Sequence, residues 1–136
     1  MTNTKSARRP PIHMIDSEAD ALADLALGVA KQLPEVSEML LSEITRATIH
    51  KAARLPRDVV AMYSTVEFVD EASNATHVCQ LVYPKDADIS AGRVSILTPV
   101  GAGLIGLREG QTILWPRRDG RERRLAIIKV SQRQDA

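Results

Sequence analysis

Acidic, imidazole and thiol side chains are the first candidates for chemistry in this sequence of 136 residues. Histidines stand at His13, His50 and His77, and the single cysteine is Cys79. None of the histidines has metal-ligand spacing with the cysteine or with a carboxylate, so we expect neither a zinc site nor any other metal. Cys79 lies inside an apolar run that is typical of a strand, which predicts an inert thiol in the core.

Asp86 and Asp88 resemble a fragment of a calcium-binding loop. A calcium loop also needs a central glycine and a terminal glutamate, and both are absent here. We therefore interpret the two aspartates as part of a solvated loop between strands. No serine, histidine and aspartate stand in an arrangement that predicts nucleophilic catalysis.

A glycine motif, G-x-G-x-x-G, occupies residues 101–106 and matches the dinucleotide fingerprint in letters. The fingerprint also requires a full helix after the glycines and an acid about twenty residues later. Glu109 and Gly110 end any helix within a turn, and Glu122, the acid at the right offset, stands among arginines. We therefore expect no bound cofactor, and we interpret the glycines as packing and turn positions.

A cluster of arginines surrounds the turn signal Asp119-Gly120. Such a cluster could contact phosphates, each contact adding a salt-dependent increment to affinity. No aromatic residues are interleaved to stack on bases, so nucleic-acid binding is expected to be weak if it occurs. A solvated face is our main interpretation, and an acidic protein surface is the next. The residues concerned are Arg117, Arg118, Arg121, Arg123 and Arg124.

Composition indicates an ordinary globular protein, with 44% hydrophobic residues and a net charge of +1. Aromatic residues are only 3%, so the core must be built mainly from aliphatic side chains. No apolar run approaches the roughly 18 residues of a membrane span, and the N-terminus lacks the apolar stretch of a secretory signal. With a single cysteine, these features predict a cytoplasmic protein without membrane contact.

The N-terminal part is expected to hold a flexible leader, residues 1–14, and two helices within residues 15–54. The first helix should begin at Asp16 or Ser17, with Ser17 to Asp20 as a variant of the capping box. Pro34 ends that helix and suits the first position of the second. Apolar residues recur at helical spacing in both, at Leu22, Leu25, Val29 and Leu33 and then at Val36, Leu40, Ile44 and Ala47.

Two such helices joined by a tight break should pack as a short antiparallel coiled coil. A length of about 15 to 18 residues each would give a hairpin of about 25 Å. Its tip is expected at Pro34, with the acids Glu35 and Glu38 in the first turns of the second helix.

Residues 55–131 change to the two-residue periodicity of strands. We expect five short strands in an antiparallel sheet with one small helix after Pro99, and a frayed tail at 132–136. Hairpin turns are predicted at residues 70–74 and at Asp119-Gly120. The fold class is therefore α+β.

The segments LPRDVVAMYSTVEF, LVYP and GRVSILTPVGAGLIGLREGQTILW occupy residues 55–68, 81–84 and 92–115. In this order and spacing they resemble the C-terminal domain of the Gre transcript-cleavage factors, and more closely the regulator of nucleoside diphosphate kinase (Rnk) family. The resemblance implies an FKBP-like domain behind a coiled coil, and a partner, RNA polymerase, contacted at the rim of its secondary channel. Ser95, Thr98 and Pro99 lie in the most similar segment and are the candidate docking edge.

The same resemblance directs attention to the helical tip. In Gre factors the tip of a long coiled coil offers acidic residues to the catalytic magnesium of the polymerase. Here Leu33-Pro34 occupies that place and the helices are about half as long, as in Rnk-type proteins. We therefore expect a non-enzymatic regulator that competes with Gre factors and has no small-molecule substrate. The alternative interpretation of Glu35 and Glu38 is that they serve only the helix dipole.

Two alternatives remain open. One is a genuine transcript-cleavage factor of Gre type. The other is a prolyl isomerase or chaperone on the FKBP-like fold, which would need aromatic rings converging on a hollow. The available rings are Tyr63, Phe68, Tyr83 and Trp115. Tyr63 alternates away from Phe68, so we expect the fold without this catalysis.

Overall fold

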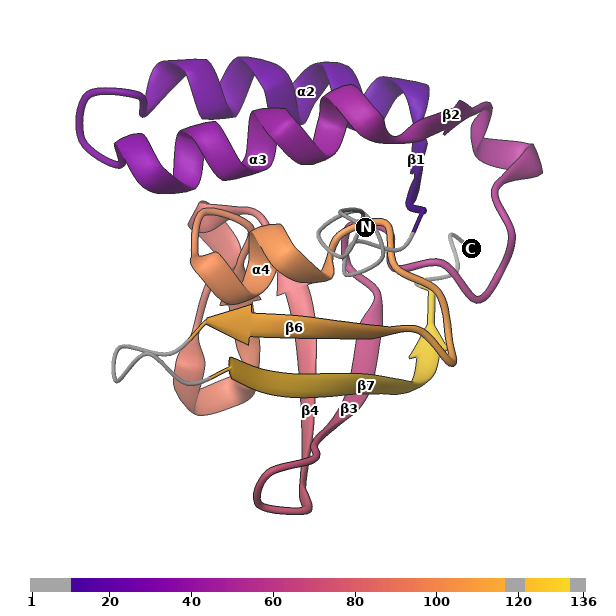
Figure 1. The fold of residues 1–136 in the computed structure, drawn as a ribbon. Coiled ribbons are helices and arrows are strands. Elements are labelled where there is room, and N and C mark those ends of the chain that lie inside the picture. The colour runs from indigo at the N-terminus through magenta and orange to yellow at the C-terminus, as the bar shows by residue number, and fades with distance from the viewer. Residues whose placement is uncertain (1–10, 117–121, 133–136) are drawn as a thin grey trace, which may run out of the picture.

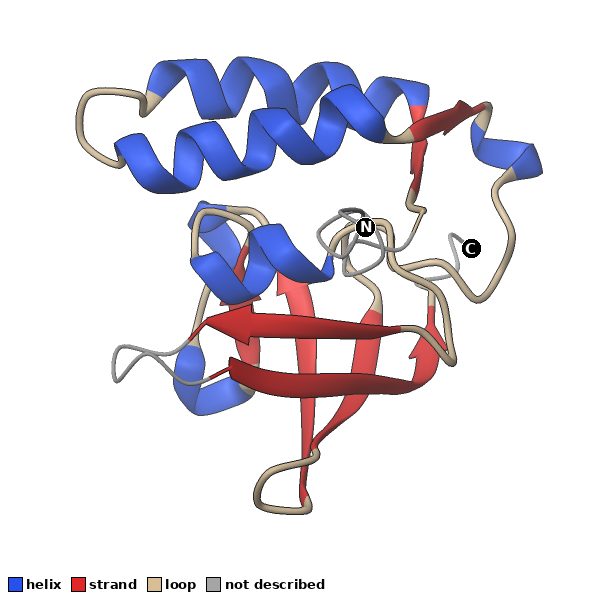
Figure 2. Cartoon of the chain, viewed as in Figure 1, coloured by secondary structure: helices blue, strands red, loops and turns tan. Residues whose placement is uncertain are grey.

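The structure is a computed structural model that describes residues 11–116 and 122–132, with the backbone alone at 113–116 and 122–123. Figure 1 shows a helical hairpin lying across a sheet domain, and Figure 2 shows the same arrangement by element type. The main elements are β1 (His13–Ile15), α2 (Asp16–Gly28), α3 (Pro34–Arg46), β2 (Thr48–His50), β3 (Thr65–Asp70), β4 (Ala75–Val82), β5 (Arg93–Ser95), α4 (Pro99–Leu104), β6 (Thr112–Pro116) and β7 (Glu122–Ser131). Three short 3-10 helices complete the order: η1 (Ala52–Arg54), η2 (Pro84–Asp86) and η3 (Ile89–Ala91).

The helical hairpin is shorter than the sequence pattern predicts. α2 and α3 have 13 residues each, which corresponds to about 20 Å rather than 25 Å. α2 ends at Gly28, so Val29 and Leu33 lie in the connection instead of on a helical stripe, and Leu33 is 39% exposed. The connection needs these residues to reverse the chain, and it closes with a backbone hydrogen bond from Leu33 N to Val29 O. Pro34 begins α3 as expected.

The capping box expected at Ser17 to Asp20 is not present. α2 is capped by Ile15, whose side chain makes no capping hydrogen bond. The carboxylate of Asp16 accepts from the Ser17 amide instead, at 2.7 Å. The helix begins directly after β1, so the backbone direction at its start is set by strand pairing rather than by a polar cap.

β1 and β2 form a small parallel sheet that the sequence did not predict. The first two residues of β1, His13 and Met14, belong to residues 1–14, for which the sequence predicts a flexible leader. That expectation is wrong for the end of the segment, because Ile12 and Met14 are only 1% and 2% exposed. Burial of these two apolar side chains in the core is favourable in free energy, and it holds this part of the chain in place. Residues 1–10 lie outside the described part.

The larger sheet has five strands in the order β5-β4-β3-β7-β6. The pairs β3–β4, β3–β7 and β6–β7 are antiparallel, as expected. β5, however, pairs in parallel with β4, so the sheet is mixed and our expectation of a wholly antiparallel sheet is wrong. The chain leaves β4, crosses through η2 and η3, and returns in the same direction. The turn at Asp119-Gly120 falls outside the described residues.

One hydrophobic core joins the hairpin to the sheet domain. Leu22 on α2 and Leu40 on α3 are fully buried in the same cluster as Leu81 and Leu104. α4 packs against α3 and lies between the hairpin and β6 in Figure 1. The hairpin is therefore part of the folded unit and not a free appendage. No helix in the described residues is long and apolar enough to cross a membrane.

Candidate functional site

The corner between β5 and α4 brings Ser95, Thr98 and Pro99 together. Thr98 caps α4: its hydroxyl accepts from Gly101 N at 3.1 Å and donates to Ser95 O at 2.7 Å. The Ser95 hydroxyl accepts from Leu97 N at 3.0 Å. Both side chains are half-buried and hold the corner in shape, whereas Pro99 is exposed. Of the three, Pro99 is therefore the residue most open to a partner.

Glycine at two positions allows this corner to pack closely. A Cβ on Gly101 would lie 2.2 Å from Ser95 O, and one on Gly106 would lie 2.9 Å from the Ile12 Cβ. Gly106 also has a φ of +85°, which disfavours any other residue. The interpretation of the glycine motif as packing and turn positions is confirmed at these two residues. α4, which contains Gly101, has only six residues and is not the full helix that the dinucleotide fingerprint requires.

The hairpin tip places Glu35 and Glu38 as expected, both exposed near the start of α3. They are three positions apart and so share a face of the helix. The tip itself carries apolar side chains: Leu27 is 62% exposed and Leu33 39% exposed. Pro34 lies between this apolar tip and the two acids. The carboxylates are thus set back from the end of the hairpin.

The arginine cluster is described only in part. Arg117, Arg118 and Arg121 lie outside the described residues, and the side chain of Arg123 is also not described. Arg124 is exposed, and its Nε lies 3.8 Å from a carboxylate oxygen of Glu71. β6 and β7 pair up to Pro116 and Glu122, so these arginines flank or occupy the connection between the two strands.

The described tyrosine and phenylalanine rings lie in two places, and the side chain of Trp115 is outside the described part. The Tyr63 and Tyr83 rings have centroids 5.8 Å apart, and the Tyr63 hydroxyl donates to Asp86 at 2.7 Å. Phe68 instead stacks on His77, with centroids 5.3 Å apart. The separation of Tyr63 from Phe68 agrees with the alternation in the sequence, but the pairing of Tyr63 with Tyr83 was not predicted. Tyr63 has a φ of 69°, which is uncommon for a residue other than glycine.

Two other groups with possible chemistry have local structural roles. Asp88 accepts hydrogen bonds from the amide and hydroxyl of Ser90, and the Ser90 hydroxyl bond lowers the pKa of the aspartate. Cys79 is buried in β4, and desolvation raises its pKa, which agrees with an inert thiol. Among the described residues no group of three or more His, Cys, Asp or Glu side chains could hold a metal ion.

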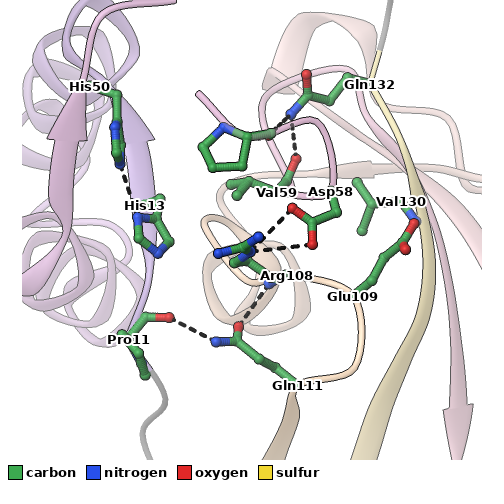
Figure 3. A network of polar contacts seen from close by, with 11 residues as sticks. Pro11, His13, His50, Asp58, Val59, Arg108, Glu109, Gln111, Val130 and Gln132 are labelled. Atoms are coloured by element: carbon green, nitrogen blue, oxygen red, sulfur yellow. Dashed lines mark hydrogen bonds and ion pairs between the residues drawn. The ribbon is translucent and has the colours of Figure 1, made fainter. Parts of the chain in front are cut away.

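A polar network at the joint between hairpin and sheet domain was missed by the sequence analysis (Figure 3). His13 Nδ1 and His50 Nε2 lie 2.9 Å apart, although the residues are 37 positions apart in the chain. Next to them, Arg108 Nε is paired with the Asp58 carboxylate at 3.1 Å. We had expected the three histidines to be scattered. Only the parallel pairing of β1 with β2 brings two of them together, and short-range periodicity carries no signal for it.

The same network fastens the surrounding loops. The Gln111 side chain accepts from Arg108 N at 2.7 Å and donates to Pro11 O at 3.1 Å. Gln132 donates to the carbonyl oxygens of Pro56 and Val59 at 2.8 and 2.9 Å. The N-terminal segment and the end of β7 are thus both bound to the loops that flank α4 and η1.

A carboxylate makes a second link across the joint. Glu18 Oε1 on α2 accepts from the Met62 amide at 3.2 Å. Burial raises the pKa of Glu18, and the hydrogen bond from Met62 acts in the opposite direction. From the sequence, Glu18 is interpreted only as part of the capping box variant at Ser17 to Asp20.

Comparison with known proteins agrees with this geometry. Residues 55–132 match the family model "Transcription elongation factor, GreA/GreB, C-term". The chain is 31% identical over 128 residues to the regulator of nucleoside diphosphate kinase of Escherichia coli, covering 94% of each chain. It is 35% identical to the transcription elongation factor GreA of Azorhizobium caulinodans, covering 80% of this chain and 74% of that one. A solved GreA/GreB elongation factor from Nitrosomonas europaea superimposes with a TM-score of 0.73 at 36% identity, covering 90% of this chain and 99% of that one.

Proposed function

Because the chain belongs to the GreA/GreB C-terminal family, we propose that it is a non-enzymatic transcription regulator that binds bacterial RNA polymerase near the secondary channel. The observation that carries this proposal is the family match over residues 55–132, which includes the β5–α4 corner. The matches to proteins named as transcription elongation factors cover 80% and 90% of this chain.

Docking would use the β5–α4 corner. Ser95 and Thr98 fix its shape through the hydrogen bonds of the α4 cap, and Pro99 presents an exposed apolar ring beside them. A partner would therefore contact a rigid edge that needs no reordering on binding, which lowers the entropic cost of association. We also propose that the sheet domain is FKBP-like and that the helical hairpin is a short coiled coil.

The hairpin would occupy the channel entrance and compete with Gre factors. Each helix has 13 residues, so the hairpin extends about 20 Å. Its exposed end is apolar, at Leu27 and Leu33, while Glu35 and Glu38 are set back on α3. A carboxylate that assists a metal must reach it directly or through one water. The short hairpin and its recessed acids therefore favour a protein that occupies the channel entrance without stimulating transcript cleavage.

A transcript-cleavage factor is the second candidate. It is favoured by one observation, the exposure of Glu35 and Glu38 on a common face close to the tip. The cleavage assay described in the Discussion separates the two candidates. The Escherichia coli relative is named as a regulator of nucleoside diphosphate kinase. We propose that any such effect of this chain is indirect and follows from its action on transcription.

Binding of the full chain to core RNA polymerase tests the proposal. We expect a complex that weakens as salt is raised and that a Gre factor displaces. Pro99→Glu should weaken the complex, because it places a charge on the docking edge without removing a hydrogen bond of the cap. Ile89→Glu is the matched control, since Ile89 on η3 is 78% exposed and lies outside the proposed edge. Absence of binding by the folded wild-type chain, or equal weakening by both variants, would contradict the docking proposal.

A further inference from the structure

The joint between the hairpin and the sheet domain contains two imidazoles in direct contact. The nitrogen atoms of His13 and His50 lie 2.9 Å apart, and the ring centroids lie 5.1 Å apart with planes inclined at 42°. The two distances differ by 2.2 Å, close to the sum of the centroid-to-nitrogen radii of two imidazole rings. The two nitrogens therefore lie nearly on the line between the ring centres. Each nitrogen points at the other, as in a hydrogen bond with one proton between them.

This geometry limits the number of protons that the pair can hold. A neutral imidazole has one N–H group and one lone pair, whereas an imidazolium has two N–H groups and no lone pair. The contact is satisfied by two neutral rings or by one neutral ring and one imidazolium. Two imidazoliums would direct two N–H groups at each other and place two positive charges in contact. The folded pair can accept at most one added proton, while the unfolded chain can accept two.

The charged groups around the pair also oppose protonation of His13. Burial lowers the pKa of His13 most, followed by the charges of His50 and Arg108, while Asp58 acts in the opposite direction. Arg108 is held at this place by its ion pair with Asp58 at 3.1 Å. Beyond the ends of β1 and β2, Asp16 and Lys51 form a further ion pair at 3.1 Å, which adds no net charge to the joint.

The pair joins the two strands that hold the base of the hairpin. His13 N donates to Gly106 O at 3.0 Å, and Thr48 N donates to Ile12 O at 2.9 Å. The first bond connects β1, which precedes α2, to the segment after α4, and the second connects β2, which follows α3, to the residue before β1. A change at the histidine pair would therefore act on the attachment of the hairpin to the sheet domain.

We propose that the His13–His50 contact is a pH-sensitive latch that keeps the base of the hairpin attached to the sheet domain and releases it in acid. The direction of the pH effect on the latch follows from proton binding. His13 has a lowered pKa in the folded chain, so the stabilisation is complete above about pH 6.5, the ordinary histidine value. It is lost progressively as the pH falls from that value through the lowered folded value, because the open form binds more protons in this range. The latch does not depend on the proposed partner.

Hydrogen exchange of the full chain at pH 7.5 and pH 5.5, corrected for intrinsic rates, tests the latch. In the wild type the Thr48 and His13 amides should lose protection several-fold on acidification, relative to the Val66 amide in β3. Proton linkage limits this loss of protection to about tenfold per pH unit for each proton that the closed form excludes. His13→Gln should remove this pH dependence. His77→Gln is the matched control and should retain it, because His77 is exposed on β4.

A titration of the wild-type imidazoles by NMR provides a second measurement that needs no variant. The His13 ring should titrate below the ordinary histidine value of about pH 6.5, because burial and the neighbouring charges lower its pKa. Titration of His13 at or above that value would overturn the latch. Unchanged relative protection of Thr48 at the two pH values would also overturn it, as would full pH dependence in His13→Gln.

Discussion

Glu18 on α2 accepts a hydrogen bond from the backbone amide of Met62 at 3.2 Å, and this contact joins the hairpin to the sheet domain. The carboxylate is half-buried, and burial raises its pKa. A single group thus satisfies a backbone donor across the joint, in surroundings that disfavour its charged form.

Glu18→Gln should stabilise the protein at pH 7 and lose this advantage near pH 4. The pKa of Glu18 is raised in the folded chain, so its favourable contribution is present below the unfolded value of about 4.5 and is lost as the pH rises through the folded value. Glutamine keeps an oxygen for the Met62 amide without the charge. Urea unfolding at both pH values checks this. Glu35→Gln, at an exposed position, should show no such difference, and an equal effect of the two variants would refute the explanation.

Ser37→Ala should destabilise the hairpin by about 1 kcal/mol. The Ser37 hydroxyl on α3 donates to Ala26 O on α2 at 2.8 Å, and the side chain is 4% exposed. The loss should stay small because Ala26 O also accepts from Val29 N. Chemical denaturation gives the free energy of unfolding. Ser42→Ala on the exposed face of α3 is the control, and a similar loss there would show that the Ala26 contact contributes nothing.

Gly101→Ala should cost about 2–3 kcal/mol, because an added methyl group would overlap Ser95 O and force the backbone of β5 or α4 to move. Gly28→Ala is the matched substitution, since no atom lies within 4 Å of a Cβ built there. At that position we expect no loss, or a gain of up to about 1 kcal/mol from helix propensity. Thermal unfolding of the two variants checks the contrast, which would fail if both were tolerated equally.

The protein should inhibit Gre-stimulated transcript cleavage and should not stimulate cleavage itself. The reason is the short reach of the hairpin, about 20 Å, and the recessed position of Glu35 and Glu38. The measurement is RNA cleavage by a backtracked elongation complex, with and without a Gre factor. The double variant Glu35→Ala, Glu38→Ala should retain the inhibition. Cleavage stimulated by this chain alone, and lost in that variant, would establish the second candidate function.

Replacement of Arg121, Arg123 and Arg124 by alanine should change little, because we expect the isolated protein to bind DNA weakly. Arg124 is already close to Glu71, which offsets part of its charge. Filter binding across a salt series is the measurement. The expectation would be contradicted by a tight DNA complex of the wild type that depends on these arginines. In that case the slope of log affinity against log salt concentration would fall by about one unit for each arginine removed.

Local patterns in the sequence were sufficient for most of the sheet domain. Alternation of apolar and polar residues predicted β3, β4 and the turn between them, and Pro99 marked the start of α4. These features depend on neighbours within a few residues, which periodicity and turn chemistry capture. The GreA/GreB resemblance predicted from residues 55–115 was confirmed by the family match and by the relatives.

The joint was not predictable in the same way. The contacts of His13 with His50 and of Glu18 with Met62 span 37 and 44 positions. The first depends on the pairing of β1 with β2, and the second depends on how the hairpin is placed on the sheet domain. The parallel direction of β5 was missed because periodicity is the same for parallel and antiparallel strands. The end of α2 was missed because Val29 and Leu33 continue the apolar spacing beyond Gly28, although they serve the turn.

The continuous core limits where insertions would be tolerated during the divergence of such proteins. Buried residues extend along both helices as far as Ala26 and Val36, while the segment from Leu27 to Glu35 is mostly exposed. Matched insertions in α2 and α3 would be accommodated beyond Ala26 and before Val36, about seven residues at a time to keep the apolar faces in register. A longer or shorter reach could then be selected without repacking the joint. Tip length and attachment can therefore vary independently, which makes the reach of the hairpin the more freely adjustable property.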